Sequence, residues 1–183
     1  IASRPRLVGM SNRLSVIVGP TAVGKGTVVA YIKKNYPDVV VSTSATTRLP
    51  RPNEVDGIDY LFLDVSEFDA MVSSGQMLEH ATVHGGNKYG TPRSPVEDAL
   101  AKGKSVILEI DIQGARQVKE SMPQARSVFI APPSWDELER RLTQRGTESP
   151  EQQQERLATA RVEMAAQSEF DWVVVNDLSL IHI

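Results

Sequence analysis

Short, mainly apolar runs alternate with longer amphipathic segments along most of the chain. The apolar runs cover residues 14–18, 39–41, 105–110, 127–130 and 172–175. Runs of this length between turn residues are typical of buried strands. The segments that follow have helix-start signals or an apolar face, and they begin near residues 25, 94, 115, 134 and 149. This alternation predicts an α/β fold with a mostly parallel sheet.

The block between about residues 44 and 92 has a different pattern. The strands expected in it are 57–63 and 77–83, with a turn-rich loop at 84–91. Ser66 and Asp69 have the spacing of a capping box that starts a helix between these strands. Gly75 suits the C-terminal end of that helix. We therefore expect a small inserted β-rich unit.

Serine residues mark three helix starts in the second half of the chain. Ser94, followed by proline, predicts a helix that ends near Gly103. Ser134 and Glu137 form a second capping-box pattern. Ser149, again followed by proline, starts a longer helix.

Composition narrows the class of protein. The chain has 183 residues, 40% of them hydrophobic, with a formal net charge of −3 and no cysteine. These values favour one globular domain and give no basic footprint for nucleic acid. No apolar run approaches the roughly 18 residues of a membrane span, and no signal-peptide pattern is present. We expect a cytoplasmic protein with no nucleic-acid, membrane or obligate protein partner.

The two ends differ from the rest of the chain. Residues 1–13 are polar, and we expect them to form a flexible N-terminal extension. The chain begins with Ile1, and Met10 could be a native start. Residues 172–175 are predicted to be a buried strand with only 176–183 after it. We therefore expect a chain that is cut short in its last element.

The first strand leads into a glycine-rich loop and then a helix, which is the context that a phosphate-binding P-loop requires. Gly19, Gly24 and Lys25 match G-x-x-x-x-G-K, but Gly26 takes the place of the usual serine or threonine and Thr27 follows it. The glycines let backbone N–H groups turn inward at the helix N-terminus, where an anion binds well. An ordinary glycine-rich turn is the alternative, and the correctly spaced lysine argues against it. Which hydroxyl reaches Mg²⁺ is open.

Two groups of arginines suggest that the substrate is a phosphate donor together with a phosphorylated acceptor. Arg141 and Arg145 are four residues apart, and Arg156 opens the next helix, so the three can close over a moving phosphoryl group. Arg48 and Arg51 lie in a second, hydroxyl-rich loop and match phosphate geometry. Taken singly, each arginine could instead be a solvated surface charge. A second phosphate site separate from the P-loop favours a kinase over a simple nucleotide hydrolase.

Several motifs along the chain resemble those of the guanylate kinase family, a group of P-loop nucleoside monophosphate kinases. They are GPTAVGKGT at 19–27, STSATTRLPR at 42–51, GIDYLF at 57–62, LEHA at 78–81, GNKYGT at 86–91, IDIQG at 110–114, RGTE at 145–148 and VNDL at 175–178. They follow the family's order from about residue 14 to 178.

The resemblance implies a P-loop kinase fold of three layers with a parallel core sheet, a small mixed β-rich GMP-binding unit and a helical lid. After the extension at 1–13, the single domain 14–183 would divide into a core (14–43, 93–134 and 169–183), a GMP-binding unit (44–92) and a lid (135–168). The implied reaction transfers the γ-phosphoryl group of ATP to GMP, or to dGMP, with Mg²⁺ bound to ATP. ADP and GDP are the implied products.

Family positions also imply the role of each site residue. The ATP-binding residues would be Gly19, Pro20, Thr21, Ala22, Val23, Gly24, Lys25, Gly26 and Thr27, with Asn176 near the adenosine. The GMP phosphate would bind Arg48, Arg51, Tyr60 and Tyr89. Guanine N1–H and the 2-amino group would bind Glu79 and Asp111, and O6 would bind Ser44 and Thr91. The catalytic residues would be Lys25, Arg141, Arg145 and Arg156. Thr27 would contact Mg²⁺ through phosphates and water.

Guanine recognition also has a physical basis in the residues themselves. Guanine presents two donors on its Watson–Crick edge, so two carboxylates select it over adenine. Asp111 follows a buried strand, at the edge of an open α/β sheet where ligands bind. Glu109 stands where many family members have aspartate, which leaves its contact with metal or water open.

Three rival interpretations remain at this stage. A kinase for another nucleoside monophosphate is disfavoured by Glu79 and Asp111. A related interaction module without catalysis is disfavoured by the intact Lys25 and the lid arginines. The third alternative is a chain of the same family that is inactive because it is truncated.

Overall fold

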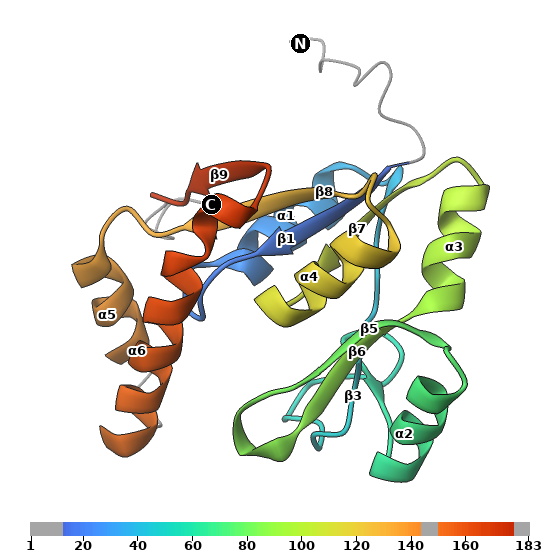
Figure 1. Ribbon diagram of the computed structural model, residues 1–183, viewed down its shortest axis with the longest axis horizontal. Coiled ribbons are helices and arrows are strands. Elements are labelled where there is room, and N and C mark those ends of the chain that lie inside the picture. Colours follow the sequence, from blue (N-terminus) through green and yellow to red (C-terminus); the bar gives the residue numbers. More distant parts are fainter. Residues whose placement is uncertain (1–12, 144–149, 178–183) are drawn as a thin grey trace, which may run out of the picture.

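The computed structural model describes residues 13–143 and 150–177, which contain a five-stranded sheet (Figure 1). The strand order is β2-β7-β1-β8-β9, and every neighbouring pair is parallel. The strands are β1 (Leu14–Val18), β2 (Val39–Val41), β7 (Ser105–Glu109), β8 (Arg126–Ala131) and β9 (Trp172–Val175). The predicted α/β class with a parallel core sheet is therefore confirmed.

The central strand β1 is buried on both faces, which explains why all of its residues except Ser15 are apolar. Successive side chains of a strand point to opposite faces. Val16 and Val18 accordingly pack in one cluster with Phe129, whereas Ile17 packs in another with Val29. The first cluster lies under α3 (Arg93–Ala101) and α4 (Ile112–Ser121), and the second lies under α1 (Lys25–Asn35).

A second sheet of four strands lies apart from the core, on the lower side in Figure 1. Its order is β4-β3-β6-β5, with β3 and β4 parallel and the other pairs antiparallel. The elements here are β3 (Ala45–Thr46), β4 (Leu61–Phe62), α2 (Val65–Ser73), β5 (Met77–Thr82), a 3₁₀ turn (η1, His84–Gly86) and β6 (Lys88–Pro92). Phe68 of α2 packs on Ala45 and Met77 to form a small core of its own. This sheet is the mixed β-rich unit that we expected.

Two helices form the remaining layer, beside the core and away from α3 (Figure 1). They are α5 (Trp135–Thr143) and α6 (Pro150–Ala165), and a 3₁₀ turn, η2 (Gln167–Glu169), follows. Leu138, Leu142 and Ala160 pack between the helices. The proposed limits of the core, the GMP-binding unit and the lid stay predictions. In 13–143 and 150–177, no helix has both the length and the apolar character that crossing a membrane requires.

Two predicted helix starts were wrong in position. Helix α2 is capped by Asp64, whose carboxylate accepts from Glu67 N at 2.8 Å while the Glu67 carboxylate accepts from Asp64 N at 3.0 Å. Ser66 lies inside the first turn instead. Helix α3 begins at Arg93, directly after β6, so Ser94 is not its cap. Both proposed capping patterns occur near the true start but are shifted along the chain.

Three strand predictions were wrong in their bounds or burial, because contacts between distant segments determine these features. The strand expected at 57–63 shrinks to β4, because Gly57 has a φ of +75° and turns the chain before it. The loop expected at 84–91 contains most of β6, which pairs with β3 and β5. Strand β9 forms as predicted but is not buried, since its four side chains are 47–56% exposed. It is the edge strand and pairs with β8 alone among the described residues.

Candidate active site

The loop between β1 and α1 has the backbone geometry of an anion site. Gly19 and Gly24 have φ values of +147° and +93°, and Gly24 precedes the helix without a side-chain cap. A Cβ on Gly19 would lie 2.3 Å from the Ile130 carbonyl oxygen, so no other residue fits there. The first N–H groups of α1 therefore face the loop with the positive end of the helix dipole.

Lys25 lies across this loop. Its Nζ donates to the carbonyl oxygens of Gly19 and Pro20, at 2.5 and 3.1 Å. Glu109 ends β7, the strand next to β1. Burial raises the pKa of the Glu109 carboxyl, while the positive charge of Lys25 acts in the opposite direction. The site residues predicted from the sequence did not include Glu109, although an acid at the end of a buried strand was a visible signal.

Asn176 supports the loop from behind. It is 7% exposed, and its Nδ2 donates to the Val23 carbonyl oxygen at 2.8 Å. Its backbone N–H donates to the Ala131 carbonyl oxygen at 2.8 Å, which fixes it at the end of β9. The sequence placed Asn176 near the adenosine, and the structure shows its amide engaged with the loop backbone.

A pair of carboxylates lies where β5 meets α4. Glu79 is 4% exposed, and Thr91 donates to its Oε1 at 2.6 Å. Burial raises the pKa of Glu79 to about 7; the Thr91 hydroxyl opposes this shift, and the negative charge of Asp111 adds to it. Asp111 caps α4 by accepting from Gly114 N at 2.8 Å. A Cβ on Gly114 would lie 2.2 Å from Glu79 Oε2, so glycine is required for this close approach.

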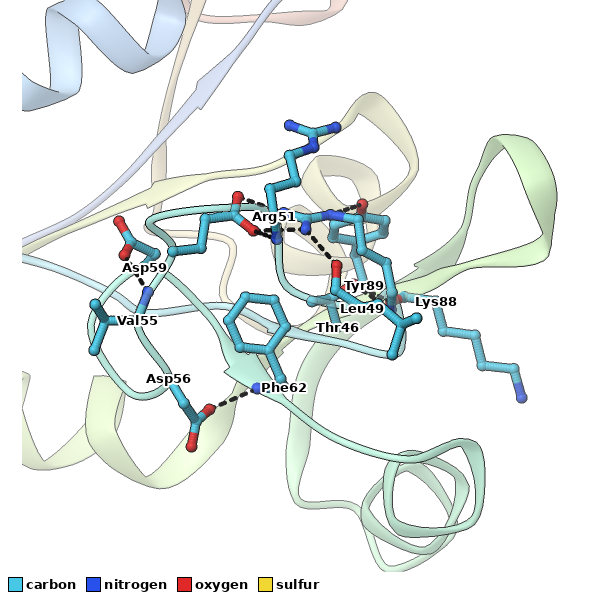
Figure 2. Close-up of polar contacts among 11 residues, drawn as sticks. Thr46, Leu49, Arg51, Val55, Asp56, Asp59, Phe62, Lys88 and Tyr89 are labelled. Atoms are coloured by element: carbon cyan, nitrogen blue, oxygen red, sulfur yellow. Dashed lines mark hydrogen bonds and ion pairs between the residues drawn. The ribbon is translucent and has the colours of Figure 1, made fainter.

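Arg48, Tyr60 and Tyr89 form a cluster in the small β-rich unit, where Figure 2 shows Tyr89. The Arg48 Nε donates to the Tyr89 hydroxyl at 3.1 Å, and the guanidinium lies 5.0 Å from the centre of the Tyr60 ring. Burial raises the pKa of Tyr60, so its hydroxyl stays protonated and can donate. Arg51 is exposed, and its backbone N–H is bound to Glu54.

One cavity of about 940 Å³ connects these regions, which is within the size range of ligand sites. Its lining includes Thr21, Lys25, Ser44, Tyr60, Glu79 and Asp111. Glu109 and Tyr89 also line it, and α6 contributes Thr159, Val162 and Glu163. The cavity therefore brings together the P-loop, the carboxylate pair and the two tyrosines. Among the described residues, Arg48 and Arg51 are not part of this lining.

Two of the three arginines predicted for the lid, Arg141 and Arg156, do not line the cavity in the described part of the chain. Arg141 on α5 donates from Nε to Glu137 at 2.7 Å and from Nη2 to the Asn176 carbonyl oxygen at 3.5 Å. Arg156 lies half-buried on α6. Arg145 falls in 144–149, outside the described residues. The Glu137 N–H donates to the Ser134 hydroxyl oxygen at 3.1 Å, which is the contact expected where Ser134 caps α5.

A glycine-rich anion loop between a parallel strand and a helix, next to a cavity with a second site, defines a P-loop nucleotide-binding protein. The family model for guanylate kinase matches residues 11–179. The guanylate kinase of Leifsonia xyli subsp. xyli is 61% identical over 176 residues, which cover 96% of this chain and 69% of that protein. The guanylate kinase of Nocardia farcinica is 60% identical over 166 residues, which cover 90% of this chain and 86% of that protein.

A solved structure gives the same result. The crystal structure of guanylate kinase from Anaplasma phagocytophilum has a TM-score of 0.74 and 37% identity, covering 91% of this chain and 77% of that one. The chain belongs to the guanylate kinase family. Its activity is the transfer of the γ-phosphoryl group of ATP to GMP, which gives ADP and GDP. The predicted family and activity are confirmed.

Proposed function

We propose that ATP binds at the P-loop end of the cavity and GMP at the carboxylate end. Lys25 and the N–H groups of the loop hold the ATP phosphates in this proposal, supported by the loop geometry and the position of Nζ. The residues of that loop are Gly19, Pro20, Thr21, Ala22, Val23, Gly24, Lys25, Gly26 and Thr27. Lys25 exchanges its two loop carbonyls for phosphate oxygens when ATP binds. Asn176 keeps the loop in shape through Val23.

Guanine binds with its donor edge toward Glu79 and Asp111. The single observation that carries this proposal is that the buried Glu79 lies next to Asp111 and that both residues line the cavity. Asp111 follows the carboxyl end of β7. A buried carboxylate needs donors, and guanine supplies N1–H and a 2-amino group. Ser44 lines the cavity and can donate to O6. Thr91 has one hydroxyl proton, which it gives to Glu79, so we assign it to positioning Glu79.

The GMP phosphate binds next to the two tyrosines. Tyr60 and Tyr89 line the cavity, and Arg48 lies directly behind them. Arg51 is exposed in the same loop and can turn its guanidinium toward the phosphate. Two arginines balance the charge of a phosphate dianion.

The lid supplies the remaining positive charge. Arg141, Arg145 and Arg156 approach the transferring group only after α5 and α6 move toward the P-loop, because Arg141 and Arg156 lie outside the cavity lining. Closure of such a lid excludes water, which is the competing acceptor. A charge that arrives with closure acts mainly in the transition state.

Residues near the P-loop fit a magnesium ion bound with ATP. Thr27 is in the first turn of α1, and the Glu109 carboxylate lies near Gly26. In the described ranges no three His, Cys, Asp or Glu side chains form a metal cluster. Phosphates and water supply most of the ligands of a magnesium ion bound with ATP. Magnesium would neutralise charge on the β- and γ-phosphates. Thr27 and Glu109 would hold it directly or through water.

A coupled assay of ADP formation tests the substrate assignment. ADP should form from ATP when GMP is added, and at background rate with AMP, CMP or UMP. ADP formation that does not depend on any nucleoside monophosphate would contradict the two-site proposal. The expected cytoplasmic location and the absence of other partners stay predictions from the sequence.

A further inference from the structure

The carboxylate of Glu54 accepts three hydrogen bonds in the loop that contains the two acceptor-site arginines. Oε2 accepts from Arg48 Nη1 at 2.7 Å and Oε1 accepts from Arg48 Nη2 at 2.8 Å. Oε2 also accepts from Arg51 N at 2.7 Å (Figure 2). Two parallel bonds between a guanidinium and a carboxylate fix direction as well as distance. Glu54 thus contacts both arginines, and sequence analysis had not predicted a role for it.

Glu54 is built into the loop by its backbone as well. Its N–H donates to the Arg51 carbonyl oxygen at 3.1 Å, which closes the turn from Arg51 to Glu54. The next residues are fixed too, since Val55 N donates to Asp59 at 2.8 Å and Phe62 N donates to Asp56 at 2.9 Å (Figure 2). The carboxylate therefore belongs to an ordered turn and is not a mobile group that a ligand could displace easily.

The contacts of Arg48 show which edge of its guanidinium faces the tyrosines that line the cavity. The Nη1/Nη2 edge faces Glu54, whereas Nε faces the Tyr89 hydroxyl at 3.1 Å. The flat face lies over Tyr60. Because Tyr60 and Tyr89 line the cavity, the Nε edge is the one nearest to a phosphate bound there. The Arg48 guanidinium holds the pKa of Glu54 at about 2, so the pair is ionised at any working pH.

We propose that Glu54 is a positioning residue for the acceptor phosphate. It holds the Nη1/Nη2 edge of Arg48 and so presents the Nε edge, beside Tyr89, to the phosphate of GMP. The proposal rests on the proposed role of Arg48. A guanidinium already held in its binding orientation loses less conformational freedom when the ligand arrives. Glu54 thereby contributes to GMP affinity without contacting GMP.

The test compares wild type with Glu54→Gln, which keeps the size of the side chain but removes its charge and one acceptor. KM for GMP should rise about tenfold to a hundredfold, the effect of weakening a hydrogen bond to a charged group. KM for ATP should not change. The inhibition constant of guanosine, which lacks the phosphate, should also stay the same. Glu97→Gln is the matched control, because Glu97 pairs with Arg93 away from the cavity, and it should leave all three constants unchanged.

A double-mutant cycle with Arg48→Ala separates positioning from general loop damage. If Glu54 acts through Arg48, Glu54→Gln should have little further effect on KM for GMP in the Arg48→Ala background. Equal effects in both backgrounds would overturn the proposal, even if Glu54→Gln lowers Tm. An unchanged or lower KM for GMP in the single variant would also overturn it, since Glu54 would then be inert or compete with phosphate. Wild type that forms no ADP with GMP would instead overturn the proposed function.

Discussion

Asn176 and Val23 are 153 positions apart in the sequence, and the side-chain amide of Asn176 donates to the Val23 carbonyl oxygen at 2.8 Å. Both residues are buried. The bond connects the end of β9 to the middle of the P-loop, the two ends of the described chain. The phosphate-binding loop therefore depends on an element that folds far from it in sequence.

Asn176→Ala should destabilise the protein and loosen the P-loop. The Val23 carbonyl would lose its partner in a buried place, which typically costs about 1–3 kcal/mol. We expect a lower urea midpoint and a higher KM for ATP than for wild type. The neighbouring exposed residue offers a control, since Asp177→Ala should change neither. Equal urea midpoints for wild type and Asn176→Ala would show that this bond does not hold the loop.

Lys25→Ala should remove most of the activity and leave the fold intact. The lysine charge acts mainly on phosphates in the transition state, and loss of one such donor typically lowers the rate by roughly 10²–10³. The measurement is kcat at saturating ATP and GMP, together with Tm. Lys34→Ala, an exposed lysine on the same helix, should retain full activity. More than half of the wild-type kcat in Lys25→Ala would contradict the role of Lys25.

Sequence patterns predicted the core and the P-loop well, for physical reasons. A strand buried on both faces is mainly apolar, so β1 and β7 were visible without tertiary information. The P-loop was visible because positive φ values at Gly19 and Gly24 admit few residues. Asp111 was found because it follows a buried strand. These features are local, and each is written in a few consecutive residues.

The features that the sequence did not reveal depend on contacts between distant segments. Strand β6 contains glycine and looked like a loop, yet pairing with β3 and β5 makes it a strand. Strand β9 is apolar yet exposed, because its position at the sheet edge is set by topology. Gly114 affects the site only because Glu79 lies against it. Glu54 affects the site only because the turn from Arg51 directs its carboxylate at Arg48.

Gly114→Ala should damage the guanine site selectively. The new methyl group would lie 2.2 Å from Glu79 Oε2 and must push the carboxylate away. We expect KM for GMP to rise at least tenfold. A tenfold change corresponds to about 1.4 kcal/mol, and the loss of a hydrogen bond to a charged group typically costs more than that. KM for ATP should stay unchanged. Glu120→Ala, an exposed site on the same helix, is the control. A normal KM for GMP in Gly114→Ala would place Glu79 outside base recognition.

Stability should depend on pH through Glu79. Burial raises its pKa from 4.5 to about 7, so between these values the folded state binds the proton more tightly than the unfolded state. The contribution of Glu79 to stability is complete below the lower value and is lost as the pH rises through the upper one. The unfolding free energy of Glu79→Gln minus that of wild type should therefore increase with pH, by up to about 3 kcal/mol. A difference that stays constant from pH 4.5 to 8 would contradict the shifted pKa.

The ionisation of Glu79 should also affect catalysis. Stability favours the protonated carboxyl, whereas GMP binding favours the ionised one. Guanine donors need an ionised carboxylate, so kcat/KM for GMP should rise as the pH increases through about 7. In Glu79→Gln this step should disappear from the pH profile. Glu67→Gln, an exposed glutamate on α2, should keep it. The same step in Glu79→Gln as in wild type would assign the ionisation to another group.

Guanine selectivity is the central claim, and one measurement tests it most directly: kcat/KM for GMP and for AMP with wild type, Glu79→Gln and Asp111→Asn. Asparagine can still cap α4, so Asp111→Asn isolates the carboxylate. A site built for a substrate's donors rejects an analogue without them by about 10⁴–10⁵. Both variants should lose activity toward GMP and narrow the GMP-to-AMP ratio, while KM for ATP stays nearly normal. A ratio unchanged in both variants would contradict the assignment of these carboxylates to guanine.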